Sequence, residues 1–284
     1  AVAGIRTEDG IEEGVDNALF GTIFHKAMQL LYEPMEDCAQ VPRDYLATVD
    51  AQKVHEAVVG AISAEYYRGD DVPESDYGGN VIVVRDTVEK YILSCVLPFD
   101  SSPARGDFRV YKLEKEMASD FCFDGNRAVR FYGFSDRIDK MPDGSLRIID
   151  YKTGSPALNH QSYDKLFNGT YSHRQSNTIN TLMYAMIAYA KYDCEVQPAL
   201  YYLRGMHDKN YSPLLIEGQG AGRDSIPIVK YSDIAERFEQ ELFAVLGKLF
   251  DPQIPFTQAE DEATCSRCDY AKLCNRGQQK GNKR

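Results

Sequence analysis

Residues 131–154 read FYGFSDRIDKMPDGSLRIIDYKTG and predict a β-hairpin. The segment Pro142-Asp143-Gly144 suits a hairpin loop, because proline presets the first turn position and glycine takes the left-handed position that closes the loop. Pairing the flanking residues Met141 and Ser145 then sets the register of the two strands. We therefore expect two antiparallel strands, one on each side of this loop.

This register gathers charge on one face of the hairpin. Asp136 is expected opposite Asp150, with Cβ atoms roughly 5 Å apart. Because side chains alternate along a strand, the even-numbered residues share a face that is apolar apart from two carboxylates and one amine. These residues are Tyr132, Phe134, Asp136, Ile138, Leu146, Ile148, Asp150 and Lys152.

Buried charges are costly unless they are paired or bind a metal, so two interpretations stay open. The first is a structural Asp–Lys–Asp salt-bridge cluster. The second is a site for a hard cation, because two carboxylates suit Mg²⁺ or Mn²⁺ better than Zn²⁺. In that site, Lys152 would polarise a water molecule or stabilise charge that develops on a phosphate.

Hydrophobic periodicity and turn residues predict the secondary structure of the rest of the chain. Residues 159–177 are polar and predict irregular structure. The order of elements predicts an α+β or mixed α/β sandwich in one domain. Helices are expected over residues 17–32, 50–67, 80–96, 178–191 and 233–250, and strands over residues 108–123, 128–140, 145–152 and 197–204.

Composition limits the function classes. The net charge of −11 is unusual for a free-standing, non-specific DNA-binding protein, because phosphate contacts need Lys and Arg. No apolar run reaches about 18 residues, so no membrane span is expected. Nothing at the start reads as a signal peptide, and the missing initiator Met indicates a trimmed chain or a fragment. Seven cysteines with mostly irregular spacing favour a reducing, cytoplasmic location over a disulfide framework.

Five motifs in one order resemble a known superfamily. The sequence Gly133-Phe-Ser-Asp136-Arg-Ile-Asp, followed by Asp150-Tyr-Lys152-Thr-Gly, resembles the PD-(D/E)xK nuclease core, and within it the RecB-type and AddB-type domains of bacterial helicase–nucleases. Three more segments match motifs of these domains, and the resemblance spans nearly the whole chain. They are Gly21-Thr-Ile-Phe-His25 (GxxxH), Asn180-Thr-Leu-Met-Tyr184 (in the place of QxxxY), and Cys265-Ser-Arg-Cys268 with Cys274 (C-x2-C-x5-C).

The resemblance implies a metal site and a catalytic lysine. Asp136 and Asp150 would be the acidic metal ligands, with His25 and the carbonyl of Tyr151 completing the inner shell. Lys152 would orient and activate the attacking water. The resemblance thereby implies Mg²⁺ or Mn²⁺ as the cofactor.

It also implies residues outside this inner set. Tyr184, with Asn180 and Gln175, would contact the DNA substrate, although Asn180 replaces the glutamine of the motif and Gln175 is out of register. Glu116 would be an outer-shell acid, with Glu114 equally available.

The tail cysteines Cys265, Cys268 and Cys274 supply too few thiolates for a closed site. In AddB-type domains a distant upstream cysteine completes a four-iron four-sulfur cluster. Here no cysteine precedes His25, and Cys38 follows it. Either the fourth ligand belongs to a longer protein, which is the alternative that we favour, or this protein lacks the cluster. We expect the tail of this chain to be loosely packed or held by neighbouring contacts.

Taken together, the resemblance implies a restriction-endonuclease-like core with a central mixed sheet flanked by helices. Residues 1–255 would be the nuclease domain with a helical insertion over residues 33–105, and residues 256–284 a Cys-rich tail. The implied activity is metal-dependent hydrolysis of DNA by an exonuclease of DNA repair or recombination, with a helicase module or subunit as partner. Two alternatives stay open: a non-catalytic DNA-end-binding module, and a zinc-binding interaction module built on the tail cysteines.

Overall fold

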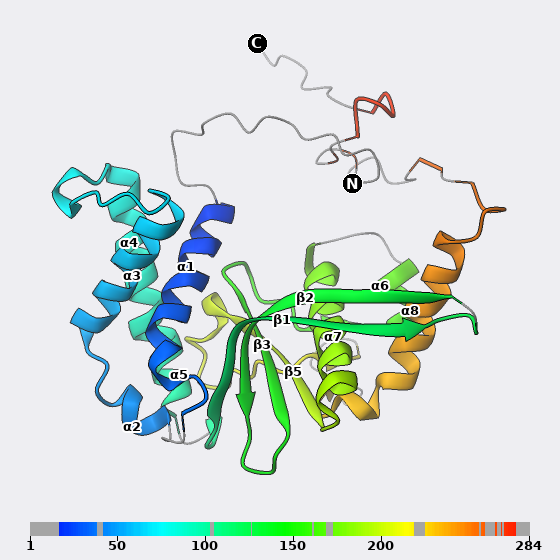
Figure 1. Cartoon of the computed structure of the whole chain (residues 1–284), viewed down its shortest axis with the longest axis horizontal. Coiled ribbons are helices and arrows are strands. Elements are labelled where there is room, and N and C mark those ends of the chain that lie inside the picture. Colours follow the sequence, from blue (N-terminus) through cyan, green and yellow to red (C-terminus); the bar gives the residue numbers. More distant parts are fainter. Residues whose placement is uncertain are drawn as a thin grey trace.

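The computed structural model describes residues 17–38, 42–102, 105–125, 127–160, 162–168, 173–218, 225–255, 257–258, 265, 268 and 270–276, except for the side chains of residues 173–175. Helices cover both faces of a central β-sheet, as Figure 1 shows. This is the mixed α/β architecture that the sequence predicts. None of the helices in this part of the chain combines the length and hydrophobicity needed to cross a membrane.

The central sheet has four strands in the order β1-β2-β3-β5. Its β1–β2 and β2–β3 pairs are antiparallel, whereas β3 and β5 are parallel, so the sheet is mixed. The predicted hairpin, β2 with β3, therefore lies at its centre. The bounds are Arg109–Cys122 (β1), Ala128–Lys140 (β2), Leu146–Lys152 (β3) and Val196–Tyr202 (β5); a small second sheet holds Asn159–His160 (β4), Ile216–Glu217 (β6) and Ile226–Pro227 (β7).

The loop of the central hairpin confirms the predicted register. The backbone N–H of Met141 donates to the carbonyl of Ser145 at 2.8 Å, and that of Gly144 donates to Met141 at 2.9 Å. Gly144 has a φ of 88°, the left-handed conformation that glycine adopts without a steric cost. The pairs that follow are Lys140↔Leu146, Asp139↔Arg147, Ile138↔Ile148 and Arg137↔Ile149.

Helices that come before the sheet in sequence cover one of its faces. Phe24 of the first helix meets the Tyr151 ring edge-on, with ring centroids 5.6 Å apart, and Tyr201 of β5 joins the same core. The elements are α1 (Asn17–Tyr32), η1 (Glu33–Met35), α2 (Pro42–Leu46), α3 (Ala51–Glu65), η2 (Glu74–Asp76), α4 (Gly79–Tyr91), the π-helical turn η3 (Ile92–Val96) and α5 (Leu97–Asp100).

The other face carries a second core, to which Ile138, Ile148 and Leu200 contribute from the sheet. Alternate residues of β3 and β5 thus enter opposite cores, as strand geometry requires. The helices on this face are α6 (Tyr163–Asn168), α7 (His173–Tyr192) and α8 (Ala235–Leu249), with the short turns η5 (Leu203–Gly205) and η6 (Tyr231–Asp233) nearby.

The prediction of irregular structure over residues 159–177 is wrong. This stretch contains β4, α6 and the start of α7. Its sequence is polar, but Tyr163 and Leu166 are buried in the second core, where the Tyr163 and Phe238 rings lie 6.1 Å apart. Tertiary burial against α8 therefore stabilises a helix that local periodicity does not predict.

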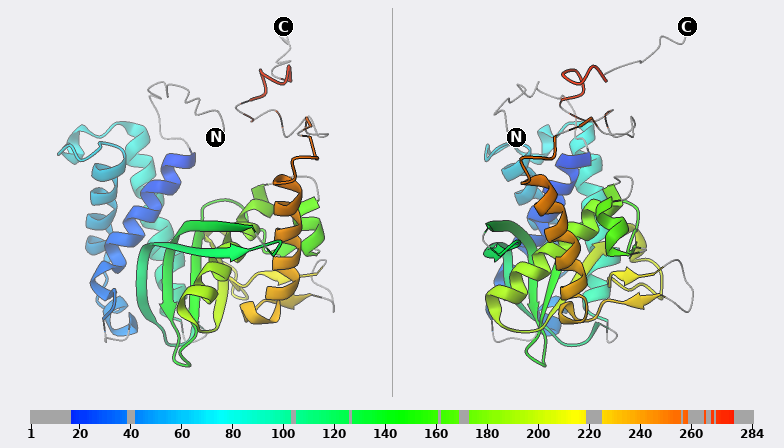
Figure 2. Two further views of the ribbon diagram at one scale, coloured as in Figure 1. Left: turned by 45° about the vertical axis from the view of Figure 1, so that its right-hand side comes forward. Right: turned by 90° about the vertical axis from the view of Figure 1, so that its right-hand side faces the viewer.

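The prediction that the even-numbered residues of β2 share one face is also wrong at one end of the strand. Tyr132 and Phe134 are 72% and 54% exposed, whereas Ile138 is fully buried. The part of β2 that precedes Arg137 in the sequence pairs only with β1, and these two strands continue toward α8 as a ribbon (Figure 2). Two-stranded ribbons twist more strongly than wider sheets, so a face extrapolated from Ile138 does not hold along the ribbon.

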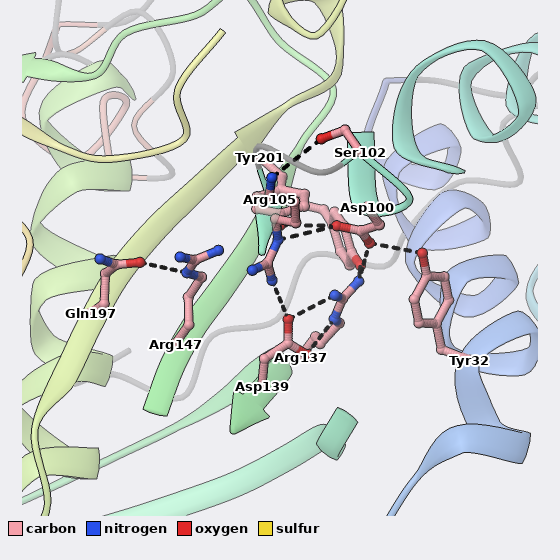
Figure 3. A network of polar contacts seen from close by, with 10 residues as sticks. Tyr32, Asp100, Ser102, Arg105, Arg137, Asp139, Arg147, Gln197 and Tyr201 are labelled. Carbon is pink, nitrogen blue, oxygen red and sulfur yellow. Dashed lines mark hydrogen bonds and ion pairs between the residues drawn. The ribbon is translucent and has the colours of Figure 1, made fainter. Parts of the chain in front are cut away.

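A buried network of charged side chains joins the sheet to the first layer of helices (Figure 3). The Arg137 guanidinium donates to Asp139 on its own strand at 2.7 Å and to Asp100 at the end of α5 at 2.6 Å. Arg105 donates to Asp139 at 2.5 Å, and the Tyr32 hydroxyl donates to Asp100 at 2.8 Å. The network ties α1, α5 and the segment before β1 to the central strand β2.

Candidate active site

A cavity of about 540 Å³ opens between α1 and the strands β1, β2 and β3. Helix α1 contributes His25 and Lys26, and the strands contribute Glu114, Phe134 and Lys152. Charged groups from distant parts of the sequence therefore meet at one place.

His25 and Asp136 are held together by the backbone of β3. The backbone N–H of Tyr151 donates to Asp136 Oδ2 at 2.7 Å. His25 Nε2 lies 3.1 Å from the Tyr151 carbonyl oxygen, and His25 Nδ1 lies 3.4 Å from Asp136 Oδ1. Burial alone would lower the pKa of His25, but the hydrogen bond with Asp136 and the negative charges of Asp136 and Asp150 raise it above its ordinary value.

Asp150 and Lys152 form an ion pair beside this group, with Nζ and Oδ2 2.5 Å apart. Burial, and then the charge of Asp136, raises the pKa of Asp150 to about 6. Burial lowers the pKa of Lys152, but its contact with Asp150 outweighs that effect and the net shift is upward. The ammonium of Lys152 is thus charged and held at the wall of the cavity.

Glu114, rather than the predicted Glu116, is the glutamate that lies beside Asp136. The register places it across from Asp136, because the residues on either side of the two are paired. Glu114 has a φ of 44°, whereas Glu116 is exposed on the ribbon. Burial, and then the charge of Asp136, raises the pKa of Glu114 to about 7. No signal in the sequence distinguishes the two glutamates, because they lie two residues apart on one strand.

The donor atoms fit a divalent cation. Within the described residues, His25, Glu114 and Asp136 can each offer one ligand atom, and these atoms lie within 4.8 Å of one another. The Tyr151 carbonyl borders the same group. Carboxylate and carbonyl oxygens are the donors that Mg²⁺ and Mn²⁺ prefer, and the imidazole of His25 adds a nitrogen donor. Burial, and then the charge of Asp136, raises the pKa values of Glu114 and Asp150, as expected for acids buried close together.

Comparison with known proteins places the chain in a family. The family model of the PD-(D/E)XK nuclease superfamily matches residues 1–275. The chain belongs to this superfamily. Over 105 residues it is 30% identical to a subunit of the ATP-dependent helicase/deoxyribonuclease of Streptococcus mutans serotype c, an alignment that covers 36% of the chain and 9% of that protein. A solved structure named "Crystal structure of SSO0001" covers 96% of the chain and is itself covered to 89%, but its TM-score of 0.26 and identity of 11% support no argument.

Helix α7 approaches the site through Tyr184. A Cβ placed on Gly133 would lie 2.5 Å from Tyr184 Cε1, so the ring packs directly against the backbone of β2. Burial, and then the charges of Asp150 and Asp136, raises the pKa of Tyr184. Asn180 is exposed one turn earlier on α7. The side chain of Gln175 lies outside the described residues.

The tail cysteines are not among the residues that line the cavity. Cys265 is buried, Cys268 is exposed and Cys274 is half-buried, and all three are free thiols. The backbone N–H of Cys268 donates to the Cys265 carbonyl at 3.2 Å. Within the part of the chain that the structure describes, these three residues do not form a group that meets the distance criterion satisfied by His25, Glu114 and Asp136.

Sequence reasoning missed three features of this site and its surroundings. Lys26 lines the cavity and donates to Gln29 at 2.9 Å, and its position next to His25 was the available signal. Phe134 lines the cavity although its pattern predicted a core residue. The buried network around Arg137 had a signal as well, because the DRID segment places an arginine and an aspartate on the strand face opposite Asp136.

Proposed function

We propose that the chain is a metal-dependent deoxyribonuclease that hydrolyses phosphodiester bonds. The observation that carries this proposal is the meeting of His25, Glu114 and Asp136 beside the cavity that His25, Glu114 and Lys152 line. A structural salt-bridge cluster explains the contact of Lys152 with Asp150, but it does not explain why a histidine and two acids converge beside it.

The residues that would hold the cation are His25, Glu114, Asp136, Asp150 and the carbonyl of Tyr151. When bound, Mg²⁺ or Mn²⁺ lowers the pKa of a coordinated water and neutralises negative charge at the phosphate. We assign Asp150 a second role, which is to position the ammonium of Lys152. The two groups form an ion pair with Nζ and Oδ2 2.5 Å apart.

We assign Lys152 two roles at the reacting atoms. Its ammonium would hold the attacking water by a hydrogen bond and stabilise negative charge on a phosphate oxygen. The water oxygen forms the new bond to phosphorus, the bond from phosphorus to the 3′-oxygen breaks, and a proton from the water passes to that oxygen. The products are a 5′-phosphate and a 3′-hydroxyl.

We further propose that the protein is a cytoplasmic exonuclease of DNA repair or recombination that acts with a helicase module or subunit. Support comes from the relative, whose name describes a subunit of an ATP-dependent helicase/deoxyribonuclease. The net charge of −11 also favours delivery of DNA by a partner, because an acidic chain has weak non-specific affinity for phosphate. In this proposal the tail cysteines and a fourth cysteine of a longer protein hold an iron–sulfur cluster.

End-labelled linear DNA, single- and double-stranded, tests the activity in Mg²⁺, in Mn²⁺ and in a chelator. Wild type is expected to cut only with the cation, and Asp136→Asn is expected to lose cutting. Closed circular DNA in parallel separates exonuclease from endonuclease action. DNA binding without any metal-dependent cleavage would favour the end-binding module, whereas bound zinc with no need for Asp136 would favour the interaction module.

Cation binding is expected to stabilise the protein more at high pH than at low pH. The pKa values of Glu114 and Asp150, about 7 and about 6, exceed the ordinary values of 4.5 and 3.8. Between about pH 4 and about pH 7 the folded state thus binds more protons than the unfolded state, and the free energy of unfolding falls as pH rises. Near-saturating Mn²⁺ should raise the melting temperature by about 5 °C at about pH 8 and by far less at about pH 5.

Glu114→Gln and Glu116→Gln form a matched pair for this measurement. Glu114→Gln is expected to reduce the Mn²⁺-induced shift, and Glu116→Gln to leave it unchanged, because only Glu114 faces Asp136. Equal shifts in the two variants would show that Glu114 is not a ligand.

A further inference from the structure

Two aromatic side chains lie on the open face of the β1–β2 ribbon next to the cavity. Tyr132 is 72% exposed and Phe134 is 54% exposed. Single exposed aromatic residues are common on protein surfaces, so exposure alone carries no functional meaning. Their position is what matters, because Phe134 lines the same cavity as His25 and Lys152.

The backbone of Gly133, which lies between the two aromatic residues, packs against α7. Gly133 packs against Tyr184 so closely that a Cβ at this position would lie 2.5 Å from the Tyr184 ring. Side chains alternate along the strand, so Tyr132 and Phe134 point away from Tyr184. The contact of Gly133 with Tyr184 therefore holds both rings on the open side of the ribbon.

The neighbours on this face leave the rings accessible. Tyr132 is paired with Ala118 on β1, and alanine is too small to cover a tyrosine ring. Arg130 lies on the same face two residues before Tyr132. Its guanidinium lies 4.0 Å from Asp120 on β1, and both side chains of this pair are more than two-thirds exposed. Arg130, Tyr132 and Phe134 thus follow one another along β2 toward Asp136.

The chemistry of this row fits an unpaired stretch of a DNA strand. Aromatic rings bind nucleobases by stacking, which tolerates any base sequence, and a guanidinium binds phosphate. Residues two apart on a strand are spaced by about 7 Å along it, close to twice the 3.4 Å repeat per nucleotide, so this backbone spacing leaves room for one base between the two rings. Bases inside a duplex already stack on one another and cannot offer a free face.

We propose that Tyr132 and Phe134 form a base-stacking platform for single-stranded DNA, with Phe134 holding the base next to the phosphate that is cut. This inference rests on the proposed nuclease function and names the residues that would select its substrate. Phe134 is thereby a substrate-binding residue that the resemblance does not assign.

The test uses oligonucleotides that carry the fluorescent base 2-aminopurine in a single-stranded tail, whose emission falls when the base stacks. Binding is measured with Mg²⁺ in the Lys152→Met background, so that the DNA is not cut. Adding Phe134→Leu is expected to weaken tail binding at least about tenfold and to abolish the quenching. Phe134→Tyr keeps the ring and should bind within about twofold of the parent.

Phe250→Leu is the matched control, because Phe250 is 50% exposed and contacts Phe123 at the far tip of the ribbon. It should leave binding unchanged, and blunt duplex should bind equally well with and without Phe134→Leu. Unaltered tail binding or persistent quenching in Phe134→Leu would overturn the platform. Cleavage is measured separately in proteins that retain Lys152. If wild type and Phe134→Leu cleave the tailed DNA with the same KM, the platform is rejected and the nuclease function stands. Ring-dependent quenching without metal-dependent cleavage rejects the nuclease function alone.

Discussion

Lys152→Met is expected to reduce DNA cleavage by about 10³-fold while the protein still binds its cation. The substitution keeps an unbranched apolar chain as far as Cε and removes the ammonium that Asp150 holds in the cavity. Initial rates on end-labelled DNA at saturating Mg²⁺ measure the loss. The Mn²⁺-induced rise in melting temperature, measured on the same sample, shows whether the variant is folded and binds metal.

Lys140→Met provides the control for this experiment. Lys140 is exposed at the other end of β2, next to the hairpin loop, and its replacement should leave cleavage within about twofold of wild type. A Lys152→Met variant that binds cation and cuts DNA at the wild-type rate would refute the role of Lys152. In that case the ion pair with Asp150 would be a structural feature only.

Arg137→Met is expected to lower the free energy of unfolding by about 3–5 kcal/mol. Its guanidinium is fully buried and joins Asp100 to Asp139 (Figure 3). The methionine would leave these two carboxylates buried with Arg105 as the nearest compensating charge. Because whole domains are stable by only about 5–15 kcal/mol, the variant would be marginal. Urea unfolding followed by circular dichroism measures the difference.

Arg127→Met is the matched substitution at a solvent-exposed pair. Arg127 contacts Asp124 at the tip of the ribbon, and its side chain is 43% exposed. Such pairs contribute about 1 kcal/mol or less. If Arg137→Met cost no more than Arg127→Met, the network would not be a source of stability. Arg137→Lys should recover little, because an ammonium cannot reproduce the forked contacts with two carboxylates.

The central hairpin is the part of the fold that local sequence could predict. Its loop uses a proline and a glycine whose backbone preferences are intrinsic, so the register from Lys140 to Arg137 follows without knowledge of any neighbour. The helices over α1, α3 and α8 follow from hydrophobic periodicity for the same reason. The motifs around Asp136, Asp150 and Lys152 indicated the superfamily, because the order of these residue types along the chain is itself sequence information.

The tertiary structure alone decided which acids meet and which aromatic rings stay exposed. Glu114 and Glu116 are equivalent in the sequence, and only the register of β1 on β2 places one of them across from Asp136. Phe134 has the same periodicity as Ile138, but β3 pairs with β2 only beside Ile138, so one is exposed and the other is buried. Arg137 finds Asp100 through the packing of α5 on the sheet. Each outcome depends on contacts between segments that are distant in the chain, and residue order alone does not encode them in a readable pattern.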